Sequence, residues 1–249
     1  MFDALFTTTT EYKKLSHALS GKGACALFGL PASGRAQVYA ALCRQLDKPL
    51  CIVTPGEAEA TRFAADLNTL GIPAAVFPAR DYVLRPIEGT AREYEYRRLA
   101  VLGELVGGRL RAVAVPAEAL TQFTTPKEDF CANTRTLHAG DTLLRDDLLA
   151  ALFGAGYTRR AQVDGPGQFS VRGDIVDIFA PDQKMPVRME FWGDEIDTLH
   201  TFDLTTQRRE DAIDKFYLSP AREVLFGKPA DAAEQLRAFL AKQRGKKKT

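Results

Sequence analysis

The chain has 249 residues, of which 45% are apolar, and its 33 basic and 32 acidic residues leave a formal charge of +1. That length suffices for one large or two ordinary domains with a hydrophobic core. The near-neutral charge excludes an overall electrostatic attraction to DNA or to an anionic membrane, so any nucleic-acid contact has to be local. No segment approaches the roughly 18 apolar residues of a membrane helix, and the first residues lack a secretion-signal pattern. We therefore expect a cytoplasmic protein without a membrane partner.

The cysteines give no sign of a metal site or a disulfide. Cys25, Cys43, Cys51 and Cys131 form no C-x-x-C pair and have no histidine at ligand spacing. Three of them lie in apolar or amphipathic segments, where a reduced thiol is ordinary. The sequence therefore predicts neither a metal nor a cofactor bound through cysteine.

The first half of the chain alternates short apolar runs with segments of helical periodicity. Strands are expected at ACALFG (24–29), PLCIVTP (49–55), AAVFP (74–78) and RAVAVP (111–116). Helical spacing is expected over 34–46, around 63–70, over 90–106 and over 117–122. Apolar strands separated by helices indicate a parallel sheet that is covered on both faces, with right-handed crossovers. We predict an α/β domain over residues 1–126.

After Pro126 the periodicity changes. A helix with Leu144, Leu148 and Leu152 on one face is followed by alternation with period two in QFSVR (168–172), DIVDIF (174–179), PVRMEFW (186–192) and EIDTLHTF (195–202). This pattern predicts antiparallel strands in an α+β domain over residues 127–218. A tight turn is expected over 192–195, and a bend or bulge over 172–174. Residues 219–249 are expected to return toward the α/β region, with a short helix over 231–242 and a frayed tail.

The run GLPASGRAQ (29–37) has the frame of a phosphate-binding loop, in which Gly29 and Gly34 would keep the turn. Arg35 stands where such a loop has lysine, and a planar guanidinium does not replace a compact ammonium. Ala36 stands where a hydroxyl would bind Mg²⁺, so the charge of a transferred phosphoryl group would be poorly compensated. We predict a degenerate loop that survives as architecture, with no ATPase activity and no nucleotide cofactor. Weak anion binding by its backbone stays open.

Polar and aromatic residues alternate with the core residues of PVRMEFW. Arg188, Glu190 and Trp192 are expected on the face opposite the core, and the same alternation in QFSVR turns Arg172 outward. Tryptophan and arginine are typical anchors of protein interfaces. The alternative is a cross-strand pair of arginine and glutamate that shields a half-buried tryptophan and has no function. The pattern alone does not separate these two interpretations.

Three runs carry a resemblance to a known family: GQFSVRGDIVDIFAP (167–181), PVRMEFWGDEIDTLHTFDLTTQRR (186–209) and LSPAREV (218–224). They resemble the N-terminal UvrB-like module of the bacterial transcription-repair coupling factor (Mfd), and VAVPAEAL (113–120) agrees with it. The module is also similar to UvrB itself. Arg35 and Ala36, the short connection over 78–96, and Ser170 in place of a second arginine favour the coupling factor over UvrB.

The resemblance implies a helicase-like (RecA-type) α/β core that has lost its ATPase, with an inserted domain similar to the UvrA-binding domain 2 of UvrB. It implies that Arg172, Arg188 and Trp192 contact UvrA, with Glu190 near the partner. Charge reversal at Arg172 or Arg188 would then abolish UvrA binding and leave the melting temperature close to that of the native chain, as expected for exposed residues. The chain itself would not be an enzyme, whereas the longer protein would be an ATP-dependent DNA translocase. RNA polymerase and DNA would be bound by parts absent here, and another part of the longer chain is expected to mask the UvrA-binding face.

Two other functions remain possible from the sequence. One is a nucleotide-binding fragment of a helicase or translocase, which would bind ATP directly. The other is a DNA-binding piece of a helicase, and the near-neutral charge without a basic, aromatic-interleaved stretch is evidence against it.

Overall fold

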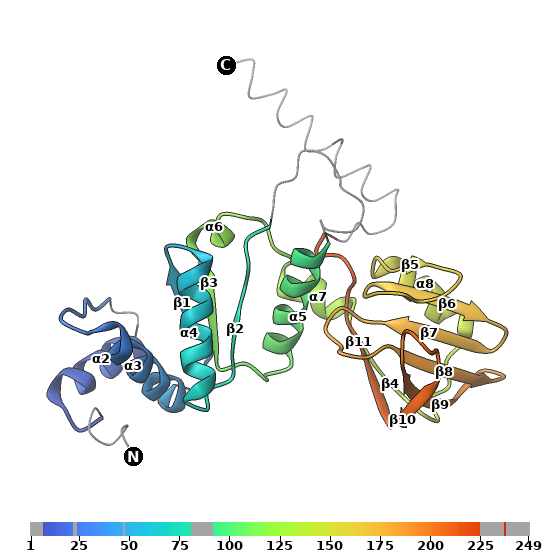
Figure 1. The fold of residues 1–249 in the computed structure, drawn as a ribbon, viewed down its shortest axis with the longest axis horizontal. Helices are drawn as coiled ribbons and strands as arrows, with labels where there is room; N and C mark the ends of the chain where they lie inside the picture. Colours follow the sequence, from blue (N-terminus) through green and yellow to red (C-terminus); the bar gives the residue numbers. More distant parts are fainter. Residues whose placement is uncertain (1–6, 22–23, 47, 81–91, 225–236, 238–249) are drawn as a thin grey trace. The chain divides into compact units, whose positions relative to one another are not determined.

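The computed structural model describes residues 7–21, 24–46, 48–80, 92–224 and 237 (Figure 1). The chain divides into two compact units, Met1–Phe123 and Thr124–Thr249. Within the described ranges no helix is long and apolar enough to cross a membrane. Apart from residue 237, the helix expected over 231–242 lies outside the described residues, as do residues 81–91 of the short connection over 78–96. The domain boundaries given above stay predictions.

The first unit is built around a small parallel sheet. Its elements are α2 (Thr10–Ser20), α3 (Ala32–Gln45), β1 (Leu50–Thr54), α4 (Glu57–Thr69), β2 (Ala74–Val76), α5 (Glu93–Val106), β3 (Ala112–Pro116) and α6 (Ala117–Leu120). The strand order is β1-β3-β2, and both pairs are parallel. Three of the four predicted strands and their parallel pairing are therefore confirmed.

Helices pack on both faces of this sheet, as a parallel sheet of apolar strands requires. Alternate residues of β3 point to opposite faces. Ala114 packs with Phe63 and Leu67 of α4 in one hydrophobic cluster, and Val113 packs with Val101 of α5 in another. Figure 1 shows α4 lying along the strands.

The strand expected over residues 24–29 is absent. These residues lie outside helix and strand, all six are exposed, and 88% of the surface of Phe28 is accessible. The run pairs with none of the strands of the described sheet, β1, β3 and β2, so its apolar pattern alone does not make it a strand.

The loop that precedes α3 also differs from the expected phosphate-binding turn. Gly29 does have the left-handed conformation, with φ of 81°. Gly34, however, lies inside α3, which begins at Ala32. There a Cβ atom would come within 3.3 Å of the Pro31 ring, so the glycine allows close packing and does not form the turn.

The second unit consists mainly of strands. Its elements are α7 (Lys127–Ala132), β4 (Arg135–His138), α8 (Arg145–Gly154), β5 (Thr158–Arg159), β6 (Gln168–Arg172), β7 (Ile175–Phe179), β8 (Val187–Trp192), β9 (Glu195–Phe202), β10 (Arg209–Ala212) and β11 (Lys215–Leu218). Six of the strands form one sheet in the order β10-β9-β8-β7-β6-β5, antiparallel except for the β5–β6 pair. The four predicted antiparallel strands are confirmed as β6 to β9.

One face of the six-stranded sheet holds the core of this unit. Leu148 and Leu152 of α8 are fully buried against it, together with Phe169 of β6 and Met189 of β8. The strands β4 and β11, which pair with each other, add Phe216 to the same cluster. The alternation of β6 to β9 is therefore explained by α8 on one side. The opposite face carries polar residues together with a smaller hydrophobic cluster of Val163, Phe179 and Phe202.

The expected bend at 172–174 is a tight hairpin turn. Arg172 pairs directly with Ile175, so the turn has only two residues, and Gly173 adopts the left-handed conformation with φ of 61°. The turn after β8 has the same form, with Gly193 at φ of 61° between the paired residues Trp192 and Glu195.

Candidate partner-binding face

The sheet face opposite α8 carries a group of charged and aromatic residues, which we call the arginine face. Strand alternation brings them to one side from four different strands. Its members are Arg172 of β6, Asp177 of β7, Arg188, Glu190 and Trp192 of β8, and Arg209 of β10. The strand register places Asp177 directly beside Arg188, and Glu190 beside Thr198 of β9.

Asp177 organises the arginine face. Its side chain is 1% exposed and accepts hydrogen bonds from two arginines. The Nε and Nη2 atoms of Arg188 donate to its two oxygens at 2.7 and 3.0 Å, and Nη2 of Arg172 donates to Oδ2 at 2.9 Å. The Asp177–Arg188 pair is bidentate, the geometry in which arginine and carboxylate bind most strongly.

Arg188 was expected to be exposed, and this expectation is wrong. Its residue surface is 8% exposed, its guanidinium lies 4.8 Å from the centre of the Phe202 ring, and its Nη1 donates to the carbonyl oxygen of Gln207 at 3.2 Å. The hydrogen bond to Asp177 is the main cause that raises the pKa of Arg188 above its ordinary value. Strand alternation gives the direction of a side chain but not what lies over it, and here the turn after β9 contributes a cover.

That turn, residues 203–208, is stabilised by Asp203. One of its carboxylate oxygens accepts hydrogen bonds from the backbone N–H groups of Thr205 and Thr206 at 3.1 and 2.7 Å. The bonds from Thr206 lower the pKa of Asp203, followed by the bond from Thr205. Gln207, whose carbonyl oxygen accepts from Arg188, has a positive φ of 60°. The turn thus fixes the acceptor that holds one edge of the Arg188 guanidinium.

Glu190 also has partners within the chain. Its Oε2 accepts from the hydroxyl of Thr198 at 3.2 Å, and its Oε1 accepts from Nη2 of Arg209. Its side chain is 20% exposed, whereas that of Arg209 is 47% exposed. Arg209 was not singled out from the sequence, because it lies on the short strand β10, whose register with β9 is irregular.

Trp192 stands at the end of β8 and keeps 83% of its surface exposed. An arginine–glutamate pair across strands does form, between Arg209 and Glu190, but the exposure of Trp192 contradicts the interpretation in which such a pair shields a half-buried tryptophan. With Arg172, whose side chain is 49% exposed, Trp192 forms the accessible part of the expected site. Exposed guanidinium donors and an exposed indole on one sheet face suit a protein surface with carboxylates and an apolar pocket.

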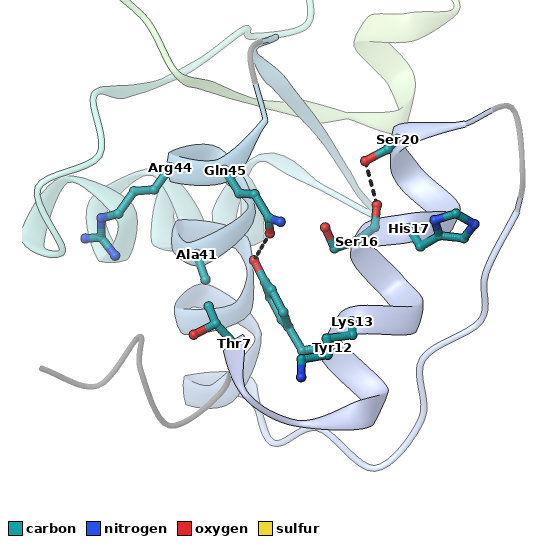
Figure 2. Close-up of a pocket in the computed structure, with 9 residues that line it drawn as sticks. All are labelled: Thr7, Tyr12, Lys13, Ser16, His17, Ser20, Ala41, Arg44 and Gln45. Atoms are coloured by element: carbon teal, nitrogen blue, oxygen red, sulfur yellow. Dashed lines mark hydrogen bonds between the residues drawn. The ribbon is translucent and has the colours of Figure 1, made fainter.

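The loop at 29–37 shows no comparable arrangement. Arg35 is partly exposed and lies 3.9 Å from a carboxylate oxygen of Glu59, and Ala36 is buried with 3% exposure. A hollow of about 480 Å³ does occur in the first unit, between α2 and α3 (Figure 2). It is lined by other residues, among them Tyr12, whose hydroxyl donates to Gln45 at 3.0 Å. The hollow therefore gives no support to a nucleotide site at the loop.

Residues 136–224, which include the whole arginine face, match the family described as the UvrB interaction domain. By this match, the second unit contains a domain of the UvrB interaction type. The chain is 28% identical over 212 residues to a transcription-repair-coupling factor of Bacillus subtilis, covering 84% of this chain and 18% of that protein. It is 35% identical over 208 residues to the transcription-repair-coupling factor of Myxococcus xanthus, and the match covers 79% of this chain and 17% of that protein.

The UvrABC system protein B of Chlorobium limicola is 29% identical over 231 residues, covering 86% of this chain and 33% of that protein. The chain carries the UvrB-like module that occurs in transcription-repair-coupling factors. It spans less than a fifth of the length of the two coupling factors described here.

Proposed function

We propose that this chain is the UvrB-homology module of a transcription-repair coupling factor and recruits UvrA in transcription-coupled nucleotide excision repair. The observation that carries the proposal is the arginine face, which lies entirely within the segment that matches the UvrB interaction domain. Recruitment needs a surface with fixed donors and an accessible apolar anchor, and Arg172 and Trp192 offer these.

The roles of the expected contact residues follow from their burial. Arg172 and Trp192 are accessible and touch the partner. Arg188 is buried, and we assign it to the same site because it shares Asp177 with Arg172. Glu190 borders the site through its bond to Arg209.

The first unit supplies no chemistry of its own in this proposal. We propose that it is a helicase-type (RecA-like) P-loop fold with a degenerate loop, so that this chain has no ATPase, and that the longer protein is an ATP-dependent DNA translocase. The absence of a hydroxyl at Ala36, its burial, and the position of Gly34 inside α3 support a loop without nucleotide. Titration with ATP and Mg²⁺ tests this part, and saturable binding with turnover would contradict it.

Contacts with RNA polymerase and DNA are assigned to parts of the longer protein outside this chain. A further part of that protein is proposed to cover the arginine face until polymerase is engaged. If the intact protein bound UvrA as tightly as this chain does, masking would be excluded.

The decisive experiment measures binding of purified UvrA to the native chain and to two variants. Arg172→Glu and Trp192→Ala are each expected to weaken binding at least about tenfold, because they remove exposed anchors. The melting temperature of Trp192→Ala should stay near that of the native chain, since this residue is 83% exposed. Arg172 is half exposed and also bonds Asp177, so thermal unfolding of Arg172→Glu has to show that this variant is folded at the temperature of the binding measurement. The control is Lys215→Glu, which makes the same change in charge as Arg172→Glu at an exposed position of β11.

Arg188→Glu is unsuitable for this test. It would place a buried carboxylate beside Asp177, so that loss of binding could not be separated from loss of folding. Native-like affinity of both Arg172→Glu and Trp192→Ala would contradict the proposal.

A further inference from the structure

We infer that Arg209, and not Glu190, makes the further charged contact of the arginine face, and that the partner places carboxylates against Arg172 and Arg209 on either side of strand β8. The inference rests on the proposed function, since it concerns the same site. It changes which residues touch the partner and states the chemistry that the partner has to present.

Glu190 has little capacity left for a partner. Both of its carboxylate oxygens are engaged, one by Thr198 and one by Arg209, and its side chain is 20% exposed. An added cation would have to displace these bonds or share them, and bringing it into a partly buried site costs desolvation. Glu190 is therefore a positioning residue that holds Arg209 in place.

Arg209 has the opposite character. One Nη atom donates to Glu190, and its side chain is 47% exposed. A guanidinium carries five N–H donors in a planar fork, so donors remain for a bidentate bond to a carboxylate. Because Glu190 already restricts the side chain, less conformational entropy is lost when a partner binds.

Arg172 and Arg209 are equivalent in these respects. Arg172 is held by Asp177 as Arg209 is held by Glu190, and the two arginine side chains are 49% and 47% exposed. In the sheet order, β6 and β10 each lie two strands from β8. Along the strands, Arg172 is level with Glu190, whereas Arg209 pairs with Phe202 of β9 and is therefore level with the start of β8. With strands about 4.8 Å apart, the two backbones lie about 10 Å on either side of β8.

The charge of this face agrees with an acidic partner surface. Its three arginines outnumber its two carboxylates, and both carboxylates bond to arginines of the same face. A complementary surface has acidic side chains opposite the two exposed arginines and an apolar pocket for the indole of Trp192. Two separate arginines also fix the orientation of the partner along the sheet.

The test compares UvrA binding by Arg209→Glu, by Arg172→Glu as the reference, and by Lys215→Glu as the control. We expect Arg209→Glu to weaken binding about tenfold or more, because it brings like charges together, and the control to leave binding unchanged. Thermal unfolding of each variant shows whether the fold is kept. If Arg209→Glu binds like Lys215→Glu while Arg172→Glu loses binding, the inference is overturned and the proposed function stands. If the native chain does not bind UvrA, the proposed function itself fails.

A double-mutant cycle separates contact from positioning. Glu190→Gln should weaken binding in the native background, because Arg209 loses its anchor, and should have no further effect in an Arg209→Ala background. An equal loss in both backgrounds would show that Glu190 touches the partner directly and would overturn its assignment as a positioning residue.

Discussion

At the scale of single residues, the arginine face depends on Asp177, the buried carboxylate that bonds both Arg172 and Arg188. Asp177→Asn keeps the shape but removes the charge, and it leaves the guanidinium of Arg188 buried without a counter-ion. Breaking a buried pair in this way costs about 3 kcal/mol. We expect a loss of that size in the free energy of unfolding, measured by urea denaturation.

The control for this substitution is Asp174→Asn. Asp174 is 79% exposed in its side chain and makes only a 3.5 Å surface ion pair with Arg145. Its replacement should change stability by less than about 0.5 kcal/mol. Equal losses from the two substitutions would contradict the central position of Asp177.

Asp203 gives the turn after β9 a dependence on pH. Its pKa is lowered below the ordinary value by the bonds from Thr206 and Thr205, so the ionised form is the one that stabilises the folded chain. The stabilisation is complete above the ordinary value of 3.8 and is lost as the pH falls through the lower folded-state pKa. Asp203→Asn should therefore be less stable than the native chain near neutral pH, and the difference should shrink at about pH 3. Urea denaturation of both proteins at the two pH values measures this, and a constant difference would contradict a role for the charge.

At the scale of elements, the end of α8 depends on Gly156. The backbone N–H of Gly156 donates to Phe153 and that of Tyr157 donates to Leu152, which is a Schellman ending, and Gly156 has φ of 86°. A Cβ atom there would come within 2.2 Å of Cγ of Arg222. Gly156→Ala combines this clash with left-handed strain, and we expect it to lower the free energy of unfolding by about 2 kcal/mol.

Gly154, two residues earlier in α8, is the matched control for this substitution. It lies within the helix, and a Cβ atom there would meet nothing within 4 Å. Gly154→Ala should therefore be neutral or stabilising by about 0.5 kcal/mol, since alanine is the better helix former. Chemical denaturation of both variants checks the pair, and similar effects of the two would contradict this account of the helix end.

The sequence predicts those helices and strands that depend on a local pattern of residues. Period-two alternation is enough to locate β6 to β9, because each of them has one face against the core. The strands β4 and β11 are not predictable in this way, since residues 135–138 find their partner only at 215–218. The run at 24–29 fails for the converse reason, because it is apolar but pairs with no strand of the described sheet.

The candidate site shows the same limit. Alternation correctly places Arg172 and Trp192 on the outer face, and the core residues of β8 opposite them. The arginines that bond to Asp177 and Glu190 are determined by the strand register and by the turn at 203–208. Neither can be recognised from a local pattern in the sequence. For this reason the burial of Arg188 and the part played by Arg209 required the structure.

At the scale of the whole chain, the two units have separate hydrophobic clusters. Those around β1 to β3 contain residues before Phe123 only, whereas the clusters around the six-stranded sheet contain residues after Thr124 only. All residues of the arginine face belong to the second set. A core substitution in the first unit should therefore lower the stability of that unit without affecting UvrA binding, whereas one in the second unit should affect both.

Leu67→Ala and Leu152→Ala test this separation. Both leucines are fully buried, Leu67 in the first unit and Leu152 in the second, so each truncation should cost about 3 kcal/mol in its own unit. Calorimetry of each variant should show one transition lowered in temperature and the other unchanged. When UvrA binding is measured at rising temperature, only Leu152→Ala should lose binding at a lower temperature than the native chain. Only that substitution weakens the unit that carries Arg172, Trp192 and Arg209. Equal loss of binding by the two variants would show that the first unit is needed to keep the arginine face in its binding form.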